Sequence, residues 1–198
     1  MQKNLNWQLH VDFLSKKLNK SYYSLRTLKQ SISIETLKTI KVYFAYFHSL
    51  LRYGIIFWGN SSQALKVFKL QKKALRLLIP IKSHNKYPSC RSHFCKLNIM
   101  TVPSLYIFEA IIHAKSNSKT TTNANMHSHN TRQINNFHIS RSNSSISLKS
   151  ILHAGPILFN SLPKDIKSIA CSKKFKSGLK EFLIKKEFYT ISDFLNFN

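Results

Sequence analysis

Residues Ser33 to Pro80 read SIETLKTIKVYFAYFHSLLRYGIIFWGNSSQALKVFKLQKKALRLLIP, and the rest of the chain is organised around this stretch. In its first half, large apolar side chains recur every three or four residues, at Leu37, Ile40, Phe44, Phe47 and Leu51. A second row lies beside the first, at Tyr43, Tyr46, Leu50 and Tyr53. This spacing predicts a helix with more than one apolar face, so we expect it to be buried on several sides.

Short polar and glycine signals mark the ends of this first helix. Ser33 is a candidate N-cap with Glu35 in the first turn, and Gly54 and Gly59 mark its end. The polar residues that follow Gly59 predict a short turn into a second helix.

The second helix is predicted from Gln63 to Ile79, before Pro80, and it divides into two sides when wound at about 100 degrees per residue. One broad side is apolar, with Val67, Phe68, Leu70, Ala74, Leu75, Leu77 and Leu78. The other side is cationic, with Lys66, Lys69, Lys73 and Arg76, and Lys72 at its edge.

These cations have no acidic neighbour in the sequence, since no Asp or Glu occurs between Glu35 and Glu109. Cations that repeat every three or four residues without an intervening acid repel one another slightly. A polyanion outside the chain is therefore the favoured partner of this helix. A merely solvated helix face is the alternative.

The same stretch resembles a segment of a known enzyme family. The resemblance is carried by Tyr43-Phe44-Ala45-Tyr46-Phe47-His48-Ser49-Leu50-Leu51-Arg52-Tyr53-Gly54-Ile55, by Trp58-Gly59 and by Leu70-Gln71-Lys72-Lys73-Ala74-Leu75-Arg76. In order and spacing these strings are similar to the segment after the polymerase palm in reverse transcriptases of non-LTR retrotransposons, particularly the jockey-like elements of animals. The resemblance covers nearly the whole chain, from Trp7 to Tyr189.

The resemblance implies a carboxy-terminal fragment of an RNA-directed DNA polymerase, with thumb-like helices and a basic region beyond them. In the parent enzyme such a segment would close over template and primer and hold the duplex by its backbone, with the upstream palm as its partner. The candidate nucleic-acid-binding residues are Lys66, Lys69, Lys72, Lys73, Arg76 and Arg132.

The composition favours the same class of partner. The 198 residues include 31 Lys and Arg against 7 Asp and Glu, a formal net charge of +24. Such a charge attracts phosphates, so nucleic acid is the leading partner and an anionic membrane surface the second. An AT-rich coding sequence could also have raised the lysine content without selection for binding.

The most apolar run, Val42 to Trp58, is interrupted by His48, Ser49 and Arg52, so we expect no transmembrane segment. Three cysteines without framework spacing and the absence of a secretory signal predict a reducing compartment, nuclear or cytoplasmic.

The fold class predicted for the whole chain is mainly α, a helical bundle followed by a basic, partly irregular region. A helix to about Leu18 is predicted from the face formed by Trp7, Val11, Leu14 and Leu18, and a second short helix from Tyr22, Leu25 and Leu28. Thr101 and Pro103 are expected to start a helix to about Lys115. Ser172 is expected to cap a closing helix to about Lys186, followed by an aromatic tail that docks on the core.

Composition shifts divide the chain into three predicted regions: 1–115, a polar linker over 116–136, and 137–198. From Phe137 to Lys149 a loose alternation predicts a strand or extended arm. Ile151 to Asn160 is apolar with Gly155-Pro156 inside it, and we expect two packed turns there, followed by a short helix from Leu162-Pro163.

Two clusters contain potential metal ligands. His84, Cys90, His93 and Cys95 fall within a dozen residues, but a single residue between His93 and Cys95 does not match the usual zinc spacing. A small buried pair of cysteines beside surface histidines is the favoured interpretation. In the box from His127 to Arg132, His127 and His129 would share one side of an extended segment without an evident third ligand, so an exposed turn is favoured.

Catalytic chemistry is not expected from this chain. A template-directed polymerase needs clustered carboxylates to hold two metal ions, and no two of the seven acids are adjacent in sequence. With four glycines in all, the chain also lacks a glycine-rich phosphate loop. We therefore expect no catalytic residue, metal or cofactor.

Two alternatives remain open. One is a self-sufficient basic nucleic-acid-binding protein, which predicts a folded monomer without any upstream sequence. The other is a non-functional translated relic of a transposon. Exposed aromatic surface at Trp7, Tyr46 or Trp58 would favour a missing palm domain over a self-sufficient protein.

Overall fold

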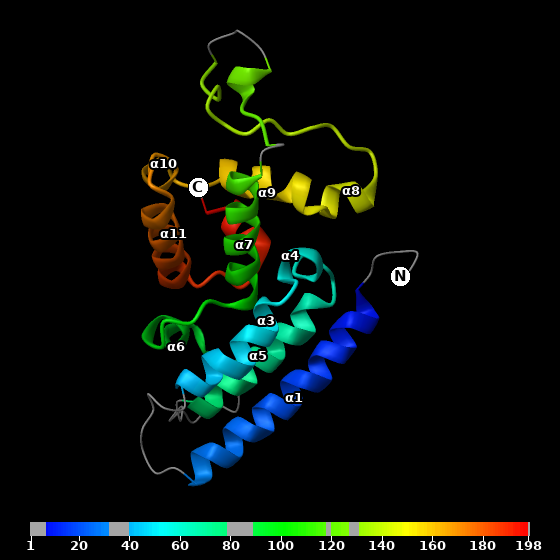
Figure 1. Cartoon of the computed structure of the whole chain (residues 1–198), viewed down its shortest axis with the longest axis vertical. Helices are drawn as coiled ribbons and strands as arrows, with labels where there is room; N and C mark the ends of the chain where they lie inside the picture. Colours follow the sequence, from blue (N-terminus) through cyan, green and yellow to red (C-terminus); the bar gives the residue numbers. More distant parts are fainter. Residues whose placement is uncertain (1–6, 32–39, 79–88, 118–119, 127–130, 198) are drawn as a thin grey trace.

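The computed structural model describes residues 7–31, 40–78, 89–117, 120–126 and 131–197, and they are mainly α-helical as predicted (Figure 1). The predicted N-cap Ser33 and the apolar Leu37 lie outside these ranges, as do Ile79 and Pro80. Among the described helices, none is both long enough and apolar enough to cross a membrane.

The N-terminal half forms a layer of helices that run side by side (Figure 1). Helix α1 spans Gln8–Ser31, and a second helical segment comprises η1 (Tyr43–His48) and α3 (Ser49–Arg52). The short helix α4 (Ile55–Trp58) leads into α5 (Ala64–Leu78). Helix α5 therefore begins and ends within one residue of its predicted bounds.

Helix α1 is one continuous helix, whereas two were expected. No glycine or proline interrupts the sequence between Leu18 and Tyr22, so nothing in it stops the helix. Its buried residues include Val11, Leu14 and Leu18 from the first predicted stripe and Leu25 from the second, which lie along the same face.

The segment Tyr43–His48 is a π-helix, and this corrects the burial expected for the aromatic residues around it. A π-helix bonds each residue to the fifth one along rather than the fourth, so the register of its faces shifts. Tyr43, Phe47 and Leu51 are fully buried at four-residue intervals. Tyr46 and Tyr53 are instead 66% and 78% exposed, because they fall on the opposite side.

Helix α7 (Val102–Ser116) lies at the centre of the molecule, between the N-terminal layer and the C-terminal helices (Figure 1). It begins as predicted, with the Thr101 side chain accepting a hydrogen bond from the Ser104 N–H. Tyr106, Ile107 and Ala110 are fully buried, so apolar burial extends around most of the helix rather than along one stripe.

Helix α9 (Ile151–Asn160) packs against α7, where two separate turns were expected. The Ser150 side chain caps it, and Pro156 lies inside it. Gly155 permits the close approach, because a Cβ at this position would lie 3.0 Å from Ala114 Cβ and 3.1 Å from the Ala110 carbonyl oxygen. Pro156 cannot donate a backbone hydrogen bond within the helix. The burial of Leu158 and Phe159 offsets the free energy that this lost bond costs.

The segment from Phe137 to Lys149 is only marginally strand-like. Thr122 and Phe137 form one isolated antiparallel bridge, beside the short 3₁₀-helix η2 (Asn123–Asn125), and residues 138–144 have no regular structure. Ser145–Lys149 then forms helix α8 rather than a strand.

The C-terminal helices close the other side of α7 (Figure 1). They are α10 (Lys164–Lys167), α11 (Ser172–Lys186) and α12 (Ile191–Leu195). The bounds of α11 match the prediction, although its N-cap residue is Cys171 rather than Ser172. The aromatic tail docks as expected, since Phe188 and Phe194 are buried and the Thr101 hydroxyl donates to the Phe188 carbonyl oxygen at 2.5 Å. The division into three regions stays a prediction.

Candidate nucleic acid interface

Helix α5 owes its position to one continuous buried face. Its buried residues are Val67, Phe68, Gln71, Ala74, Leu75 and Leu78. Apart from Gln71, these belong to the apolar side that the sequence predicted, while Leu70 and Leu77 are only half-buried. Because this face is buried, the five cations of the helix lie on the opposite side and at its edges. The helix contains no acid.

Gln71 fixes α5 against its neighbours through three hydrogen bonds. The fully buried side-chain amide donates to the Tyr43 hydroxyl at 3.1 Å and to the Met100 carbonyl oxygen at 2.8 Å. Its Oε1 accepts from the Val102 N–H at 2.9 Å, at the start of α7. Burial raises the pKa of the Tyr43 phenol well above its usual value. A single polar side chain therefore joins three segments, which the sequence pattern did not reveal.

Helices α1 and α5 run parallel, as three contacts in the same order along both helices show. The Lys66 ammonium donates to the Asp12 carboxylate, the Lys73 ammonium lies 4.6 Å from the centre of the Tyr22 ring, and the Lys29 ammonium donates to the Leu77 carbonyl oxygen. One edge of the cationic strip of α5 is therefore in contact with α1.

The Lys66–Asp12 ion pair corrects one expectation, that the strip would be uncompensated. Asp12 precedes Glu35 in the sequence and lies on a different predicted helix, so only the fold brings it next to Lys66. Both side chains remain partly exposed, at 53% and 37% for Lys66 and Asp12 respectively. An exposed pair of this kind contributes about 0 to 1 kcal/mol, so Lys66 remains able to exchange its partner for a phosphate.

The other edge of the strip lies against the docked C-terminal tail. Lys72 is half-buried, with its ammonium 4.7 Å from the centre of the Phe68 ring and 5.5 Å from that of Tyr189. The Arg91 guanidinium lies 4.6 Å from the same Tyr189 ring. Burial is the main reason that the pKa of Tyr189 is raised. Cation–π contacts of this kind position the charged groups without neutralising them.

Lys69 and Arg76 complete the strip. Lys69 is exposed between the two edges, and Arg76 is half-buried beside Tyr189, whose pKa its positive charge lowers slightly. The five predicted cations of α5 therefore form one narrow strip, bordered by α1 on one side and by Tyr189 on the other.

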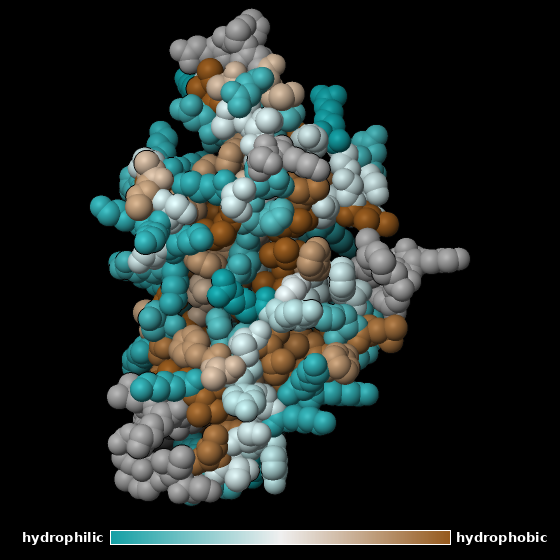
Figure 2. Space-filling model, in the orientation of Figure 1, coloured by the Kyte–Doolittle hydropathy of each residue, from teal (hydrophilic) through white to brown (hydrophobic). Residues whose placement is uncertain are grey.

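Helix α1 adds cations that the sequence interpretation did not include in this interface. Lys16, Lys17, Lys20 and Arg26 are exposed on it, and hydrophilic side chains project along the edge of the molecule where α1 lies (Figure 2). Each of the two parallel helices contains five Lys or Arg residues, and Asp12 is the one acid in the pair. We define the α1–α5 face as this pair of basic helix surfaces.

The structure does not bring Arg132 to the α1–α5 face. Arg132 is exposed in the segment that follows η2, at the opposite end of the molecule from α5 (Figure 1). His127 and His129 lie outside the described residues, so their place in the predicted box stays a prediction.

The cysteine and histidine cluster is divided by helix α6 (Arg91–Lys96). Cys90 is buried before the helix, whereas Cys95 is exposed, so the prediction of a buried cysteine pair is wrong for Cys95. His93 is half-buried, and His84 lies outside the described residues. In the part of the chain that the structure describes, no three His, Cys, Asp or Glu side chains are grouped closely enough to hold a metal ion.

The α1–α5 face combines the cations of two parallel helices with a single acid, Asp12. Comparisons with protein-family models, with curated proteins and with solved structures give no match for this chain.

Proposed function

We propose that this chain is the C-terminal part of a non-LTR retrotransposon reverse transcriptase, in which the α1–α5 face binds the phosphate backbone of template and primer. One observation supports this most strongly: two parallel helices present ten cations and one acid on adjoining surfaces. Like charges at this density repel one another, and a polyanion beside them would replace that repulsion with attraction. The catalytic centre would lie in the upstream palm domain, and the protein would act in the nucleus or cytoplasm.

The residue types favour recognition of the backbone over recognition of bases. Of the five cations on α5, four are lysines, which contact phosphates as point charges. Bidentate reading of a base edge is typical of Arg, Asn or Gln, and Gln71 is buried with its hydrogen bonds used inside the core. We therefore expect binding that depends little on sequence and strongly on salt.

The test replaces Lys66, Lys69, Lys73 and Arg76 with Gln and measures affinity for a short duplex at several salt concentrations. For duplex DNA each lost phosphate contact reduces the slope of log affinity against log salt by about 0.9. Four contacts would therefore lower the slope by about 3 to 4.

A matched control removes the same charge from α11, by replacing Lys173, Lys176, Lys180 and Lys185 with Gln. These lysines are exposed on another helix, so the net charge falls equally while the α1–α5 face is unchanged. The proposal requires the α5 variant to lose much more of the slope than the α11 variant. Equal losses would mean that the overall charge binds the duplex, and an unchanged slope would remove α5 from the interface.

A self-sufficient nucleic-acid-binding protein is the second candidate, because the described helices already enclose a core in which Trp58 is fully buried. Against it, Tyr46 and Tyr53 are highly exposed, as are Leu9 and Phe13. Exposed apolar side chains of this size are typical of surfaces that another domain covers. A monomer in dilute solution that binds no apolar dye would favour the self-sufficient protein, whereas dye binding or self-association would favour a missing palm.

A further inference from the structure

A cavity of about 550 Å³ lies next to the N-terminal ends of α1 and α5, between α4 and the segment that comprises α8 and the start of α9. Its apolar lining includes Trp7, Ile56, Phe57 and Ile146. The volume falls within the range of about 300 to 1,000 Å³ that is usual for small-molecule sites. The cavity is therefore large enough for one small ligand.

Two aromatic rings form a stacking surface in this cavity. The Trp7 and Phe57 rings lie with their centres 6.1 Å apart and their planes inclined by 27°. Phe57 is nevertheless 56% exposed, an unusual degree of exposure for a side chain that is already stacked. A planar ligand could therefore extend the stack and cover the remaining apolar surface.

The polar lining selects the charge of the ligand. Among the described residues that line the cavity, Lys149 carries the one formal charge and none is acidic. Most of the other polar groups are serine hydroxyls from the turn before α5 and from α8. A divalent cation would find no carboxylate here, whereas an anionic group would find an ammonium and hydroxyl donors.

Ser61 gives a specific reason to expect a polar ligand. Its Oγ is inaccessible to solvent, and within the described part of the chain it has no hydrogen-bond partner. A buried hydroxyl without a partner is unfavourable, and rotation of the Ser61 side chain toward the cavity would let a polar ligand supply that partner. An acyl chain would leave this hydroxyl unpaired.

We propose that this cavity binds a single nucleotide, with its base stacked on Phe57 and Trp7 and its phosphate near Lys149. A planar ring with hydrogen-bonding edges and an attached phosphate is the ligand that meets all three features of the lining. Of the described residues that line the cavity, none is a cation of the α1–α5 face, and the site does not rest on the function proposed for that face. A mononucleotide contains every chemical group that this cavity is proposed to recognise.

The test titrates the whole chain with adenosine monophosphate, with adenosine and with inorganic phosphate. Trp7 and Trp58 are the two tryptophans, and Trp58 is fully buried, so quenching by a stacked base would report on Trp7. The monophosphate should quench the fluorescence at lower concentration than adenosine, and phosphate alone should not quench it. Trp7→Phe should remove the quenching while calorimetry still detects binding.

Two variants with matched controls separate stacking from charge. Base stacking contributes about 1 to 3 kcal/mol, so Phe57→Ala should weaken monophosphate binding about tenfold. Phe13→Ala is the control, because Phe13 is 57% exposed on α1, outside the cavity. Lys149→Gln should reduce the preference for the monophosphate over adenosine severalfold, whereas Lys176→Gln on α11 should not.

The proposal is wrong if the monophosphate causes no quenching, or if Phe57→Ala and Phe13→Ala weaken binding equally. It is also wrong if an apolar dye without a phosphate competes as well as the monophosphate, because the cavity would then be a general apolar site. Each of these results leaves the salt dependence of duplex binding by the α1–α5 face untouched. Failure of this site and failure of the proposed function are thus distinguishable.

Discussion

Helices α5 and α11 are both 15 residues long and both rich in lysine, yet the fold uses their charges differently. Along α5 the cations contact Asp12, Tyr22 and Tyr189, which border the helix on both sides. On α11 every lysine is exposed, and Glu181 shares the surface with them.

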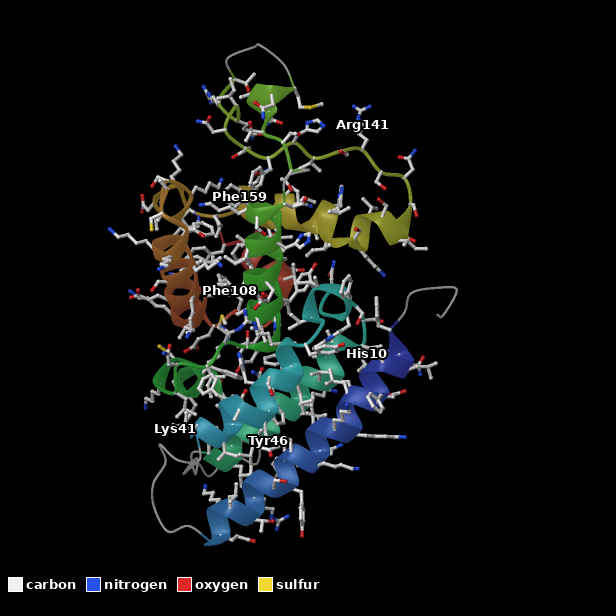
Figure 3. All side chains as sticks on the ribbon, in the orientation of Figure 1. His10, Lys41, Tyr46, Phe108, Arg141 and Phe159 are labelled. Carbon is white, nitrogen blue, oxygen red and sulfur yellow. The ribbon has the colours of Figure 1, made fainter. Side chains whose placement is uncertain are left out.

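The two helices also differ in the side chains that they bury. In helix α11, Phe175, Leu179, Leu183 and Ile184 are buried, and all four are apolar. Helix α5 has Gln71 at the centre of its buried face, where it is hydrogen-bonded to two neighbouring segments. Figure 3 labels Tyr46 and Lys41 on the helical segment beside α5. Hydrogen bonds depend on direction, whereas apolar contacts do not. The three bonds of Gln71 therefore fix the orientation of α5 against its neighbours more closely than apolar packing fixes that of α11.

The largest expected effect comes from removing this difference. Gln71→Ala would leave the Tyr43 hydroxyl, the Met100 carbonyl and the Val102 N–H buried without their partner. Because each such group costs about 1 to 3 kcal/mol, we expect the free energy of unfolding to fall by about 3 to 5 kcal/mol. Denaturant unfolding measures this change. Gln30→Ala, on the exposed surface of α1, should change it by less than about 0.5 kcal/mol.

The bounds of α5 and α11 could be predicted from the sequence because a 3.6-residue period and a helix stop are local signals. The role of Gln71 could not, because its partners lie 28 to 31 residues away in sequence. The same holds for the compensation of Lys66, since Asp12 is 54 residues away. Periodicity identifies which side of a helix is buried, but it does not identify the partners of a polar side chain.

Two glycine-to-alanine substitutions, one in the turn before α5 and one in α11, should change the stability of the fold in opposite directions. A Cβ at Gly59, in the turn before α5, would lie 2.6 Å from the Ile55 carbonyl oxygen and 2.9 Å from Tyr106 Cβ on α7. Gly59→Ala should therefore destabilise the fold by about 2 to 3 kcal/mol, as overpacking does.

Gly178 in α11 is the matched position. A Cβ there would meet only the tip of the Ile169 side chain, at 3.3 Å, which can move aside. Gly178→Ala should stabilise the fold by about 0.5 to 1 kcal/mol, because alanine loses less backbone entropy in a helix. Thermal or denaturant unfolding measures both changes. A loss of stability in Gly178→Ala as large as that in Gly59→Ala would show that α11 is packed as tightly as the turn before α5.

The central position of α7 and the packing of α9 also escaped sequence analysis, for a related reason. The pattern of α7 predicted a helix correctly, but a helix that is apolar around most of its surface gives no single face from which to infer its neighbours. In α9, Gly155-Pro156 is a turn signal in most contexts. Here the missing Cβ lets the helix approach α7 closely, and the resulting burial outweighs the local preference.

The pH dependence of stability should reveal one place where α11 acts on the N-terminal layer. Burial lowers the pKa of His48 to about 4, and the charges of Arg52 and of Lys180 on α11 lower it further. Because this value lies below the value of about 6.5 for an unfolded histidine, the unfolded chain binds more protons between these two pKa values. Stability is therefore retained above about pH 6.5 and falls as the pH drops toward 4.

Between about pH 7.5 and pH 5 we expect His48 to account for a loss of about 1 to 2 kcal/mol in the free energy of unfolding. His48→Gln should remove this part of the pH dependence. Lys180→Gln should reduce it slightly, because one of the repelling charges is gone. The same pH dependence in His48→Gln as in the original chain would show that His48 is not the titrating group.

The smallest expected effect concerns the one acid on the α1–α5 face. Asp12→Asn breaks the ion pair with Lys66, and because the pair is exposed, the free energy of unfolding should fall by less than about 1 kcal/mol. The released Lys66 should instead raise the affinity for duplex about two- to threefold at low salt. Glu181→Gln on α11 removes the same charge and is the control. If both variants raise the affinity equally, the duplex responds to the total charge of the molecule, and α5 has no advantage over α11. A rise confined to Asp12→Asn would mean that the acid opposes binding locally, at the point where α1 and α5 meet.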